Sequence, residues 1–374
     1  MIKILHLIKS LGRGGAEMLL PETLRAHDRQ CFDFAYGYFL DYKNQVVPEL
    51  EKQSAVVRCF HANNGVAILA KSGAVARFAK EWGADIIHCH LPLAGVAGRI
   101  AGKLAGIPVV YTEHNKQERY HPLTRKANLI TAGWNELVLS VSEDVESSLK
   151  KATAGKEISV QTLLNGVDTA KFDDARYDKS SAKKALSIPG NAPVVGTVAV
   201  FRDQKRLHLW LDLAKKISEH FPEAYFILVG DGPHFEALRQ QATELGIAEK
   251  TIFPGRLEEV RPWLAAMDVY LMTSEFEGLP IAMLEAMSMR LPIVSTTAGG
   301  IGEVVRTGEE GFLAPVHDYT ALLQPLLQLL KNENLRKQTG TNARRRVETA
   351  FSIERMAREL ETVYLDILKK KDQK

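Results

Sequence analysis

The chain has 374 residues, of which 45% are hydrophobic and 25% charged, and its formal net charge is +3 at pH 7. This length exceeds one typical core and predicts two domains of about 170–190 residues each. The composition is that of a soluble globular protein, and the small net charge does not indicate nucleic-acid binding. No apolar run approaches the roughly 18 residues that span a bilayer. The three cysteines lack a Cys-x-x-Cys pairing, so we expect a cytoplasmic protein.

Short apolar runs alternate with longer helical patterns in both halves of the chain. The runs are apolar throughout, which is typical of parallel strands buried on both faces. The repeated strand–helix order therefore predicts two doubly wound α/β sheets. We expect strands at 2–8, 32–38, 55–59, 85–89, 109–111, 137–141, 194–200, 225–230, 251–253, 269–272, 293–295 and 311–314.

The polar stretch 169–191 is predicted to hold a linker and one helix between the two domains. We therefore expect an N-terminal domain over 1–170 and a C-terminal domain over 171–351. The last segment, 352–371, has the period of an amphipathic helix with Ser352 in the N-cap position. Its apolar face comprises Met356, Leu360, Val363, Tyr364 and Ile367.

A glycine-rich loop follows the first expected strand. Gly14 and Gly15 open a helical pattern there, where backbone N–H groups can contact a pyrophosphate. The loop is not the dinucleotide fingerprint, because Glu17 stands where the third glycine should be, and no Walker A sequence is present. A plain tight turn is the alternative. Pro21, a few residues into the helix, is expected to kink or shorten it.

Histidines stand at the ends of two strands in the first half. His88 and His90 end one expected strand, and His114 follows another. Ligands of doubly wound sheets bind at the carboxyl ends of the strands, so these residues are candidates for the lining of a site. His88 and His90 could also supply two metal ligands, but the sequence places no third carboxylate or cysteine with them, and we predict no metal site.

Two cations directly follow the first strand of the second half. Arg202 and Lys205 are three residues apart, which puts both on one side of a turn, where they can neutralise a diphosphate leaving group. Charged side chains are mostly exposed, so two solvated surface cations are the alternative.

The most informative segment runs from Glu277 to Glu285, after the apolar run 269–272. Pro280 suits the first turn of a helix, and Gly278 lets the backbone approach a ligand closely. The two carboxylates then flank a helix N-terminus, which is an anion site. Carboxylates would repel a bare phosphate, whereas the hydroxyls of a phosphate-linked sugar donate to them. The segment predicts a nucleotide-sugar site, and two solvated carboxylates on an ordinary helix are the alternative.

The composite Glu-Gly-Leu-Pro-x4-Glu-Ala resembles the Glu-x7-Glu motif of retaining glycosyltransferases, specifically glycosyltransferase family 4 with the GT-B fold. Four more segments resemble family signatures: Gly14-Gly15-Ala16-Glu17, Asn165-Gly166-Val167-Asp168, Gly230-Asp231-Gly232-Pro233 and Phe253-Pro254-Gly255-Arg256. The likeness in organisation covers essentially the whole chain. It implies two Rossmann-like domains facing each other across a cleft, with the acceptor on the first and the donor on the second. The last helix, 352–374, would pack back on the first domain.

The resemblance also implies roles for individual residues. His114 would stabilise the donor sugar and the developing charge, and Glu277 would accept from the sugar. In many family members the leaving-group arginine sits two residues before Arg202, where this chain has Val200. The catalytic residues implied are His114, Arg202, Lys205 and Glu277. The nucleotide-sugar-binding residues implied are Gly14, Gly15, Arg256, Gly278, Leu279, Pro280, Ile281 and Glu285, with His88 and His90 lining the cleft.

The reaction implied by the resemblance is metal-independent hexosyl transfer, with retention at the anomeric carbon, from a nucleoside-diphosphate sugar to a hydroxyl acceptor. No cofactor is expected. UDP-sugars are the favoured donors and GDP-mannose the second, and the product belongs to a cell-surface polysaccharide or glycolipid. No enzymic base is evident, which fits front-face attack with the leaving phosphate taking the proton. A GT-B-fold nucleotide-sugar epimerase and a non-catalytic nucleotide-sugar-binding subunit remain alternatives.

Two segments are candidates for contact with a membrane-linked acceptor. Segment 115–126 carries five basic or imidazole side chains against the single Glu118, and segment 66–82 mixes apolar with basic residues. A basic, partly apolar rim would bind anionic lipid head groups and give a peripheral location at the inner face of the membrane. Solvated helix faces are the simpler alternative.

Overall fold

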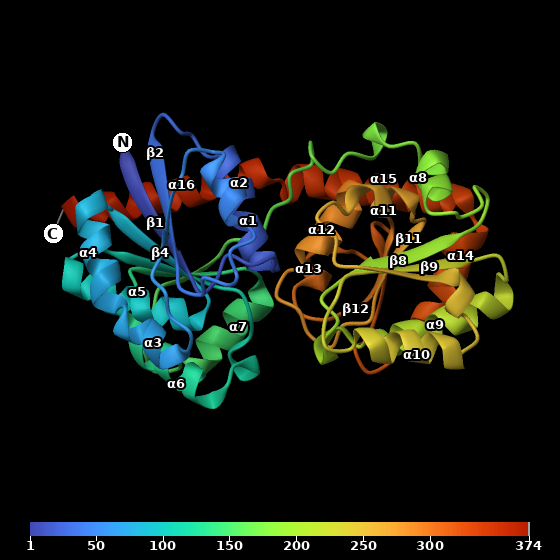
Figure 1. Ribbon diagram of the computed structural model, residues 1–374, viewed down its shortest axis with the longest axis horizontal. Helices are drawn as coiled ribbons and strands as arrows, with labels where there is room; N and C mark the ends of the chain where they lie inside the picture. Colours follow the sequence, from blue (N-terminus) through green and yellow to red (C-terminus); the bar gives the residue numbers. More distant parts are fainter. Residues whose placement is uncertain (373–374) are drawn as a thin grey trace. The chain divides into compact units, whose positions relative to one another are not determined.

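The computed structural model describes residues 1–372. The chain divides into two compact units: Met1–Gly166 together with the C-terminal helix α16 (Ile353–Asp372), and Val167–Ser352. Each unit is a parallel β-sheet with helices on both sides (Figure 1). The prediction of two doubly wound α/β sheets is confirmed.

The sheet of the first unit has seven parallel strands in the order β3-β2-β1-β4-β5-β6-β7. They are β1 (Ile2–Ile8), β2 (Phe32–Tyr38), β3 (Val56–Cys59), β4 (Ile86–His90), β5 (Val109–Glu113), β6 (Leu137–Ser140) and β7 (Val160–Thr162). The helices are α1 (Gly15–Ala26), α2 (Val47–Glu51), α3 (Gly65–Ala70), α4 (Ser72–Trp82), α5 (Pro92–Ala105), α6 (Pro122–Thr131) and α7 (Glu143–Ala152), besides α16. The edge strand β7 was not predicted, because three half-exposed residues give no apolar run.

The sheet of the second unit has six parallel strands in the order β10-β9-β8-β11-β12-β13. They are β8 (Val194–Val198), β9 (Tyr225–Val229), β10 (Thr251–Gly255), β11 (Val269–Met272), β12 (Ile293–Thr296) and β13 (Gly311–Ala314). The helices are α8 (Lys179–Ala185), α9 (Leu207–His220), α10 (Phe235–Glu244), α11 (Arg261–Ala266), α12 (Ile281–Ser288), α13 (Ile301–Val304), α14 (Leu323–Lys331) and α15 (Glu333–Ala350). The central strands are buried, so apolar β-branched residues on both faces are what this position requires.

Helix α1 continues through Pro21, so the expectation that this proline shortens the helix is wrong. The helix runs from Gly15 to Ala26 with Pro21 in its interior. Neighbouring polar groups supply bonds in this turn: the Thr23 hydroxyl donates to the carbonyls of Leu19 and Leu20, and Gln53 donates to the Pro21 carbonyl. These bonds support the turn around Pro21, but they go to other carbonyls than that of Glu17, which is the acceptor that a proline at position 21 cannot reach.

The C-terminal helix α16 packs on the first unit through the face expected from its period. Met356, Leu360, Val363, Tyr364 and Ile367 are all buried. The Tyr364 hydroxyl lies 2.7 Å from His88 Nδ1 in β4, and Glu361 accepts from the Asp28 backbone N–H beyond α1. The first unit is therefore built from both ends of the chain.

The polar stretch expected to be a linker belongs to the second unit. It contains helix α8, whose Lys183 is buried and donates to Asp268 just before β11 at 2.8 Å. Every helix among the described residues is either too short or too polar to span a lipid bilayer.

Candidate functional site

Glu277 is the centre of a polar cluster in the second unit, on the loop that joins β11 to α12. Its carboxylate is buried and hydrogen-bonded at both oxygens. Oε1 accepts from Lys205 Nζ at 2.5 Å and from the Ser274 hydroxyl at 2.6 Å, and Oε2 accepts from Gln204 Nε2 at 3.2 Å. Lys205 and Glu277, which the sequence predicted as separate site residues, thus form a direct ion pair.

Backbone contacts fasten the loop that carries Lys205 to the loop that carries Glu277. Arg206 has φ of 45°, in the left-handed region, and its guanidinium donates to the carbonyls of Thr273 at 2.8 Å and Ser274 at 3.3 Å. In return the Thr273 hydroxyl donates to the carbonyls of Lys205 and Arg206. The ion pair is therefore held by the backbone on both sides, which preorganises the ammonium group.

The loop after β12 supports Glu277 from a third side. Gly299 has φ of 62°, and a Cβ built on it would lie 2.0 Å from the Glu277 carbonyl oxygen. The N–H of Gly300 donates to the Gly278 carbonyl at 2.9 Å. Only glycine fits this position, because both the backbone angle and the close approach exclude a side chain.

Helix α12 begins one residue later than predicted. Pro280 is its N-cap, with φ of −73° and ψ of 115°, and Ile281 is the first helical residue. The N–H groups of the first turn point out of the helix and lack acceptors within it, which gives this end its positive potential. Glu285 lies in the second turn and is half-buried. The two glutamates thus lie on either side of a helix N-terminus, as predicted.

Arg202 and Arg256 lie apart from this cluster. Arg202 is exposed and lines a hollow with Asp203, Leu207 and His234, and Arg206 lines the same hollow. Arg256 follows β10 and is exposed. The structure therefore brings Lys205, and not Arg202, into contact with the glutamate loop.

The glycine loop of the first unit holds a carboxylate over the start of α1. Gly14 is the N-cap and Gly15 the first helical residue. A Cβ on Gly14 would lie 2.4 Å from Glu17 Oε2, and Glu17 Oε1 accepts from the Ser10 hydroxyl at 3.2 Å. Glu17 thus folds back toward the helix N-terminus, where negative charge is stabilised. A phosphate at this loop would have to share the N-terminus with Glu17.

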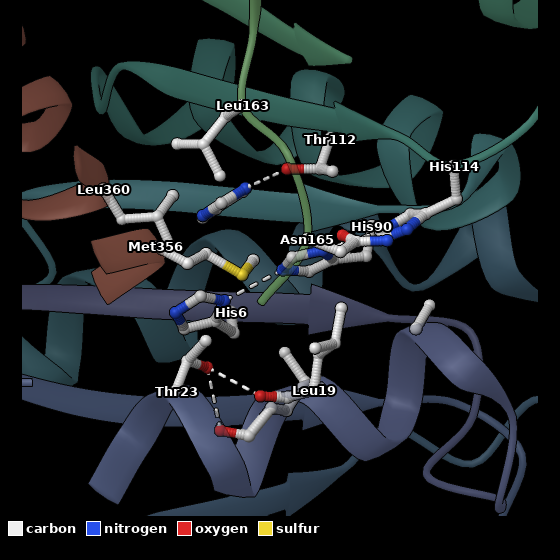
Figure 2. A pocket seen from close by; sticks show the side chains of 13 residues that line it. His6, Leu19, Thr23, His90, Thr112, His114, Leu163, Asn165, Met356 and Leu360 are labelled. Atoms are coloured by element: carbon white, nitrogen blue, oxygen red, sulfur yellow. Dashed lines mark hydrogen bonds between the residues drawn. The ribbon is translucent and has the colours of Figure 1, made fainter. Parts of the chain in front are cut away.

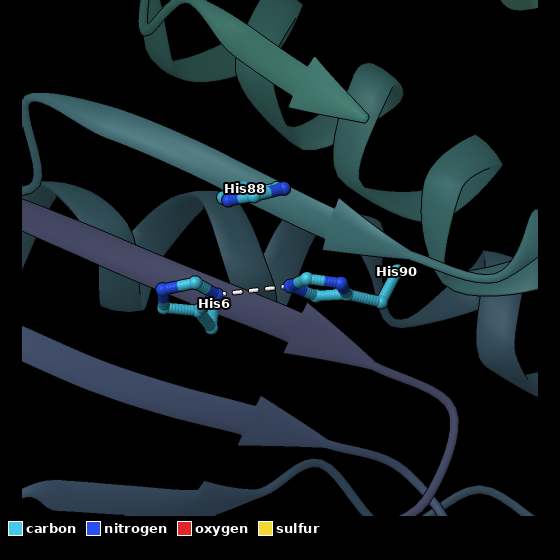
Figure 3. A group of neighbouring side chains, drawn as sticks. All are labelled: His6, His88 and His90. Atoms are coloured by element: carbon cyan, nitrogen blue, oxygen red, sulfur yellow. Dashed lines mark hydrogen bonds between the residues drawn. The ribbon is translucent and has the colours of Figure 1, made fainter. Parts of the chain in front are cut away.

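A small pocket in the first unit gathers the sequence-predicted histidines. Figure 2 shows His90 and His114 beside α1, with His6 and Thr112 on neighbouring strands. His88 completes the polar lining and bonds to two hydroxyls, with Nδ1 2.7 Å from Tyr364 and Nε2 2.7 Å from Thr112. The sheet register explains the grouping, because His6 pairs with His88 in β1 and β4, and His90 lies two residues further on the same face (Figure 3).

These imidazoles are neutral at neutral pH. Burial lowers the pKa of His88 to about 3 and that of His114 to about 4. It also holds the pKa values of His6 and His90 well below their ordinary range, and the neighbouring imidazoles add to the effect. The first unit therefore offers hydrogen-bonding but uncharged groups.

Several residues that shape these sites escaped the sequence analysis. They are His6, Gln204, Arg206, Ser274 and Gly299. His6 lies inside a strand, and only its pairing with His88 makes it part of the pocket. The pair Gly299-Gly300 directly follows a strand, and this sequence signal could have identified Gly299 as a site residue. The other four residues carry no such signal in the sequence around them.

Two family models match the chain, one in each half. "Glycosyltransferase Family 4" matches residues 14–171, and "Glycosyl transferases group 1" matches residues 178–346. Together they account for most of the sequence. The chain belongs to glycosyltransferase family 4.

Relatives and solved structures agree with membership of family 4. The chain is 29% identical over 307 residues to N-acetyl-alpha-D-glucosaminyl L-malate synthase of Bacillus anthracis, which covers 80% of each chain. It is 28% identical over 297 residues, 76% of each chain, to UDP-Gal:alpha-D-GlcNAc-diphosphoundecaprenol alpha-1,3-galactosyltransferase of Escherichia coli. The crystal structure of Anabaena Alr3699/HepE in complex with UDP-glucose matches with a TM-score of 0.86 at 25% identity, over 99% of this chain and 100% of that chain. The family 4 chain is thus a glycosyltransferase with the predicted GT-B fold.

Proposed function

We propose that this enzyme transfers a hexose from a UDP-sugar to a hydroxyl acceptor, with retention at the anomeric carbon and without a metal ion. The observation that carries the proposal is the ammonium group of Lys205, held by Glu277 beside the N-terminus of α12. A fixed cation and a helix N-terminus are what a departing diphosphate needs in the absence of a divalent cation. In this proposal the second unit carries the donor, and the first unit carries the acceptor and His114.

The proposed step breaks the bond between the anomeric carbon and the diphosphate oxygen, and the electron pair goes to the phosphate. Lys205 and the backbone N–H groups of Gly278, Leu279 and Ile281 would bind the charge that develops there; Pro280 has no N–H. The acceptor hydroxyl oxygen would bond to the anomeric carbon on the same face and pass its proton to the leaving phosphate. Charge-assisted hydrogen bonds of this kind contribute about 1.5–3 kcal/mol each.

Glu277 has a second role in this proposal. Both of its oxygens already accept hydrogen bonds from Lys205, Ser274 and Gln204. A carboxylate has about four acceptor positions, so one remains for a sugar hydroxyl. Glu277 would therefore fix the ammonium group and contact the donor sugar through the remaining lone pair.

The other sequence-predicted residues are assigned around this centre. Glu285 would accept from the ribose hydroxyls, and the backbone near Arg256 would contact the base. Arg202, which is exposed, would add a second positive charge near the diphosphate. Gly14 and Gly15 would approach the pyrophosphate from the first unit. His114 would face the donor sugar as a neutral hydrogen-bonding group.

The names of similar proteins support a UDP-linked donor and a glycan acceptor. The Escherichia coli relative is named as a UDP-Gal galactosyltransferase acting on a diphosphoundecaprenol, and the Anabaena structure holds UDP-glucose. We infer a UDP-sugar first, with GDP-mannose second, and a product in cell-surface polysaccharide or glycolipid.

Part of the first unit supports contact with a membrane-linked acceptor. Helix α6 exposes Leu123 (73%) and Ile130 (60%), with Lys126 also exposed, and Val66 at the start of α3 is 80% exposed. Lys116, by contrast, is paired with Asp144 at 2.7 Å. The candidate lipid surface therefore comprises exposed residues of α3, α4 and α6, with Arg77 and Lys80 of α4 among them. Flotation with anionic and neutral vesicles tests it, and equal binding to both would remove the membrane proposal.

The experiment that tests the function is a thermal-shift panel of UDP-, GDP-, ADP- and TDP-sugars, run with EDTA and with magnesium. A ligand at 100 times its dissociation constant adds about 2.7 kcal/mol to the stability of its domain. We expect one nucleotide class to stabilise the protein equally in both buffers. A flat response, or stabilisation only with magnesium, would contradict the proposal.

Product analysis with the donor alone separates the alternatives. A transferase hydrolyses its donor slowly and consumes it rapidly only with acceptor. A GT-B-fold epimerase would convert the donor sugar without any acceptor, and a non-catalytic subunit would bind the donor unchanged. Either of the last two outcomes would replace the transferase proposal.

A further inference from the structure

Three histidines of the first unit form a continuous hydrogen-bonded chain. His6 Nδ1 lies 2.9 Å from His90 Nε2, and His90 Nδ1 lies 3.3 Å from His114 Nε2. The chain starts in β1, crosses to β4 and ends directly after β5 (Figures 2 and 3). His90 uses both of its ring nitrogens in this chain, so it connects His114 to His6.

The arrangement differs from a metal centre, although His6, His88 and His90 have ring nitrogens within 4.8 Å of one another. Figure 3 shows the bonded nitrogens of His6 and His90 facing each other, so a shared ion would lie between them. A tetrahedral Zn²⁺ with Zn–N bonds of about 2.0–2.1 Å holds two nitrogen ligands about 3.3 Å apart, whereas these two nitrogens lie 2.9 Å apart, which is an ordinary hydrogen-bond distance. His88 directs its nitrogens at Tyr364 and Thr112 instead.

Each of the three histidines carries only one ring proton, because each is neutral. Burial holds the pKa values of His6 and His90 well below their ordinary value, and that of His114 at about 4. A neutral imidazole carries one N–H donor and one bare nitrogen acceptor. His90 must therefore donate to one of its two neighbours and accept from the other.

We propose that His6 and His90 determine which ring nitrogen of His114 carries its proton. Only two arrangements satisfy both hydrogen bonds: all three histidines protonated on Nδ1, or all three on Nε2. In the first, His114 has an N–H at Nδ1, and in the second it has a bare nitrogen there. His6 and His90 are thus positioning residues that act through His114.

The consequence for catalysis rests on the proposed function, in which His114 meets the donor sugar. A sugar hydroxyl can donate or accept, and the shared tautomer decides which it must do at Nδ1 of His114. A mixed population of His114 tautomers would present the wrong partner for part of the time. The two hydrogen bonds tie the tautomer of His114 to those of His90 and His6, so His114 cannot change tautomer alone, and this coupling is a form of preorganisation.

The test is ring 15N NMR of the full-length protein labelled at histidine, because the two neutral tautomers give distinct Nδ1 and Nε2 resonances. We expect His6, His90 and His114 to share one tautomer in the unsubstituted protein. Different tautomers within the three would overturn the proposal. This measurement needs no donor or acceptor, so it stands even if the proposed function fails.

A substitution distant from the substrate sharpens the test. His6→Phe should release the constraint, so that the Nδ1 and Nε2 resonances of His114 move toward each other as both tautomers become populated. The matched control is His27→Phe. His27 is also buried, but it bonds to Glu361 and to none of the three histidines. Unchanged His114 resonances in His6→Phe, or equal changes in the control, would overturn the proposal.

Kinetics then connect the chain to the reaction. His6→Phe should lower kcat with a smaller change in the KM for the donor, and His27→Phe should leave both closer to the original values. Loss of the shared tautomer with unchanged kcat would overturn the catalytic consequence alone. Absence of transfer by the unsubstituted protein, with the shared tautomer intact, would instead reject the proposed function.

Discussion

Each unit places polar groups near the ends of its parallel strands, but the groups are uncharged in the first unit and charged in the second. In the first, His6, His90 and His114 are uncharged and bond to one another. In the second, Lys205 and Glu277 are an ion pair fastened by neighbouring backbone. The hydrogen bonds between the neutral histidines depend on where their ring protons lie, and protonation at low pH therefore disrupts them. An ion pair depends on the presence of both charges and on rigid support, so the two units should fail under different perturbations.

The largest expected effect is the loss of the fixed cation in the second unit. Lys205→Ala should reduce kcat by about 10²–10³-fold, because it removes charge stabilisation that grows in the transition state. Steady-state kinetics at saturating donor measures this effect. Lys215→Ala, at a partly exposed position of α9 where Lys215 pairs with Glu219, is the control and should retain activity. Unchanged turnover in Lys205→Ala would contradict the leaving-group role.

The rigid support of the ion pair should break at Gly299. Gly299→Ala places a Cβ 2.0 Å from the Glu277 carbonyl oxygen at φ of 62°, and should destabilise the second unit by roughly 3 kcal/mol. Gly308→Ala is matched, since Gly308 has φ of 86° but open space around its Cβ position. It should show only the backbone penalty of about 1–2 kcal/mol. Calorimetry distinguishes them, and equal losses would show that the contact with Glu277 is unimportant.

The buried neutral histidines should make the stability of the first unit more sensitive to acid than that of the second unit. Burial lowers the pKa of His88 in the folded protein to about 3, from an ordinary value of about 6.5. Between these values the unfolded state binds more protons, so stability falls as pH falls below 6.5, by about 1.4 kcal/mol per pH unit for one such histidine. The lowered pKa values of His6, His90 and His114 act with the same sign.

Urea unfolding of the two units at pH 6.5 and 5.0 measures this difference. The first unit should lose about 2 kcal/mol or more over this interval. The histidines of the second unit are at least partly exposed, so its transition should move less. Equal shifts for both units would contradict the assignment of a neutral buried chain.

The smallest effect concerns nucleotide affinity. Glu285→Ala should weaken UDP binding about tenfold, because it removes hydrogen bonds to the ribose that contribute about 1–1.5 kcal/mol in total. Isothermal titration calorimetry measures the dissociation constant. The control is Glu223→Ala at an exposed turn. An unaltered dissociation constant would remove Glu285 from the ribose site and leave the rest of the comparison intact.

Local patterns predicted the elements well, and tertiary contacts account for what they missed. Apolar runs predicted nearly every strand, and the residue spacing from Glu277 to Glu285 predicted both glutamates about one helix N-terminus. The role of His6 depends on the register of β1 against β4, and that of Gly299 on a loop more than twenty residues away in sequence from Glu277. His6 leaves no local trace in the sequence. The Gly299-Gly300 pair after β12 is a local signal, whereas its partner, Glu277, is not marked by it.

The remaining differences from expectation concern two prolines and one arginine. Pro21 was expected to shorten α1, but the Thr23 and Gln53 side chains supply bonds around it, and the helix continues. Pro280 was expected inside α12 and is its N-cap, one residue earlier. Arg202 is exposed and lines a hollow that includes none of Ser274, Glu277 and Gly278, so its contribution to the diphosphate stays a prediction.

The packing of α16 on the first unit determines when that unit can be completed during synthesis. Tyr364 is made 276 residues after His88, its partner in β4. A nascent chain that has emerged only through the first sheet lacks this hydroxyl and leaves uncovered the surface on which Met356, Leu360 and Val363 will pack. The second unit, continuous from Val167 to Ser352, has all its residues before then. The ribosome therefore delivers the second unit complete first, and the histidine pocket reaches its final packing only after α16 has left the exit tunnel.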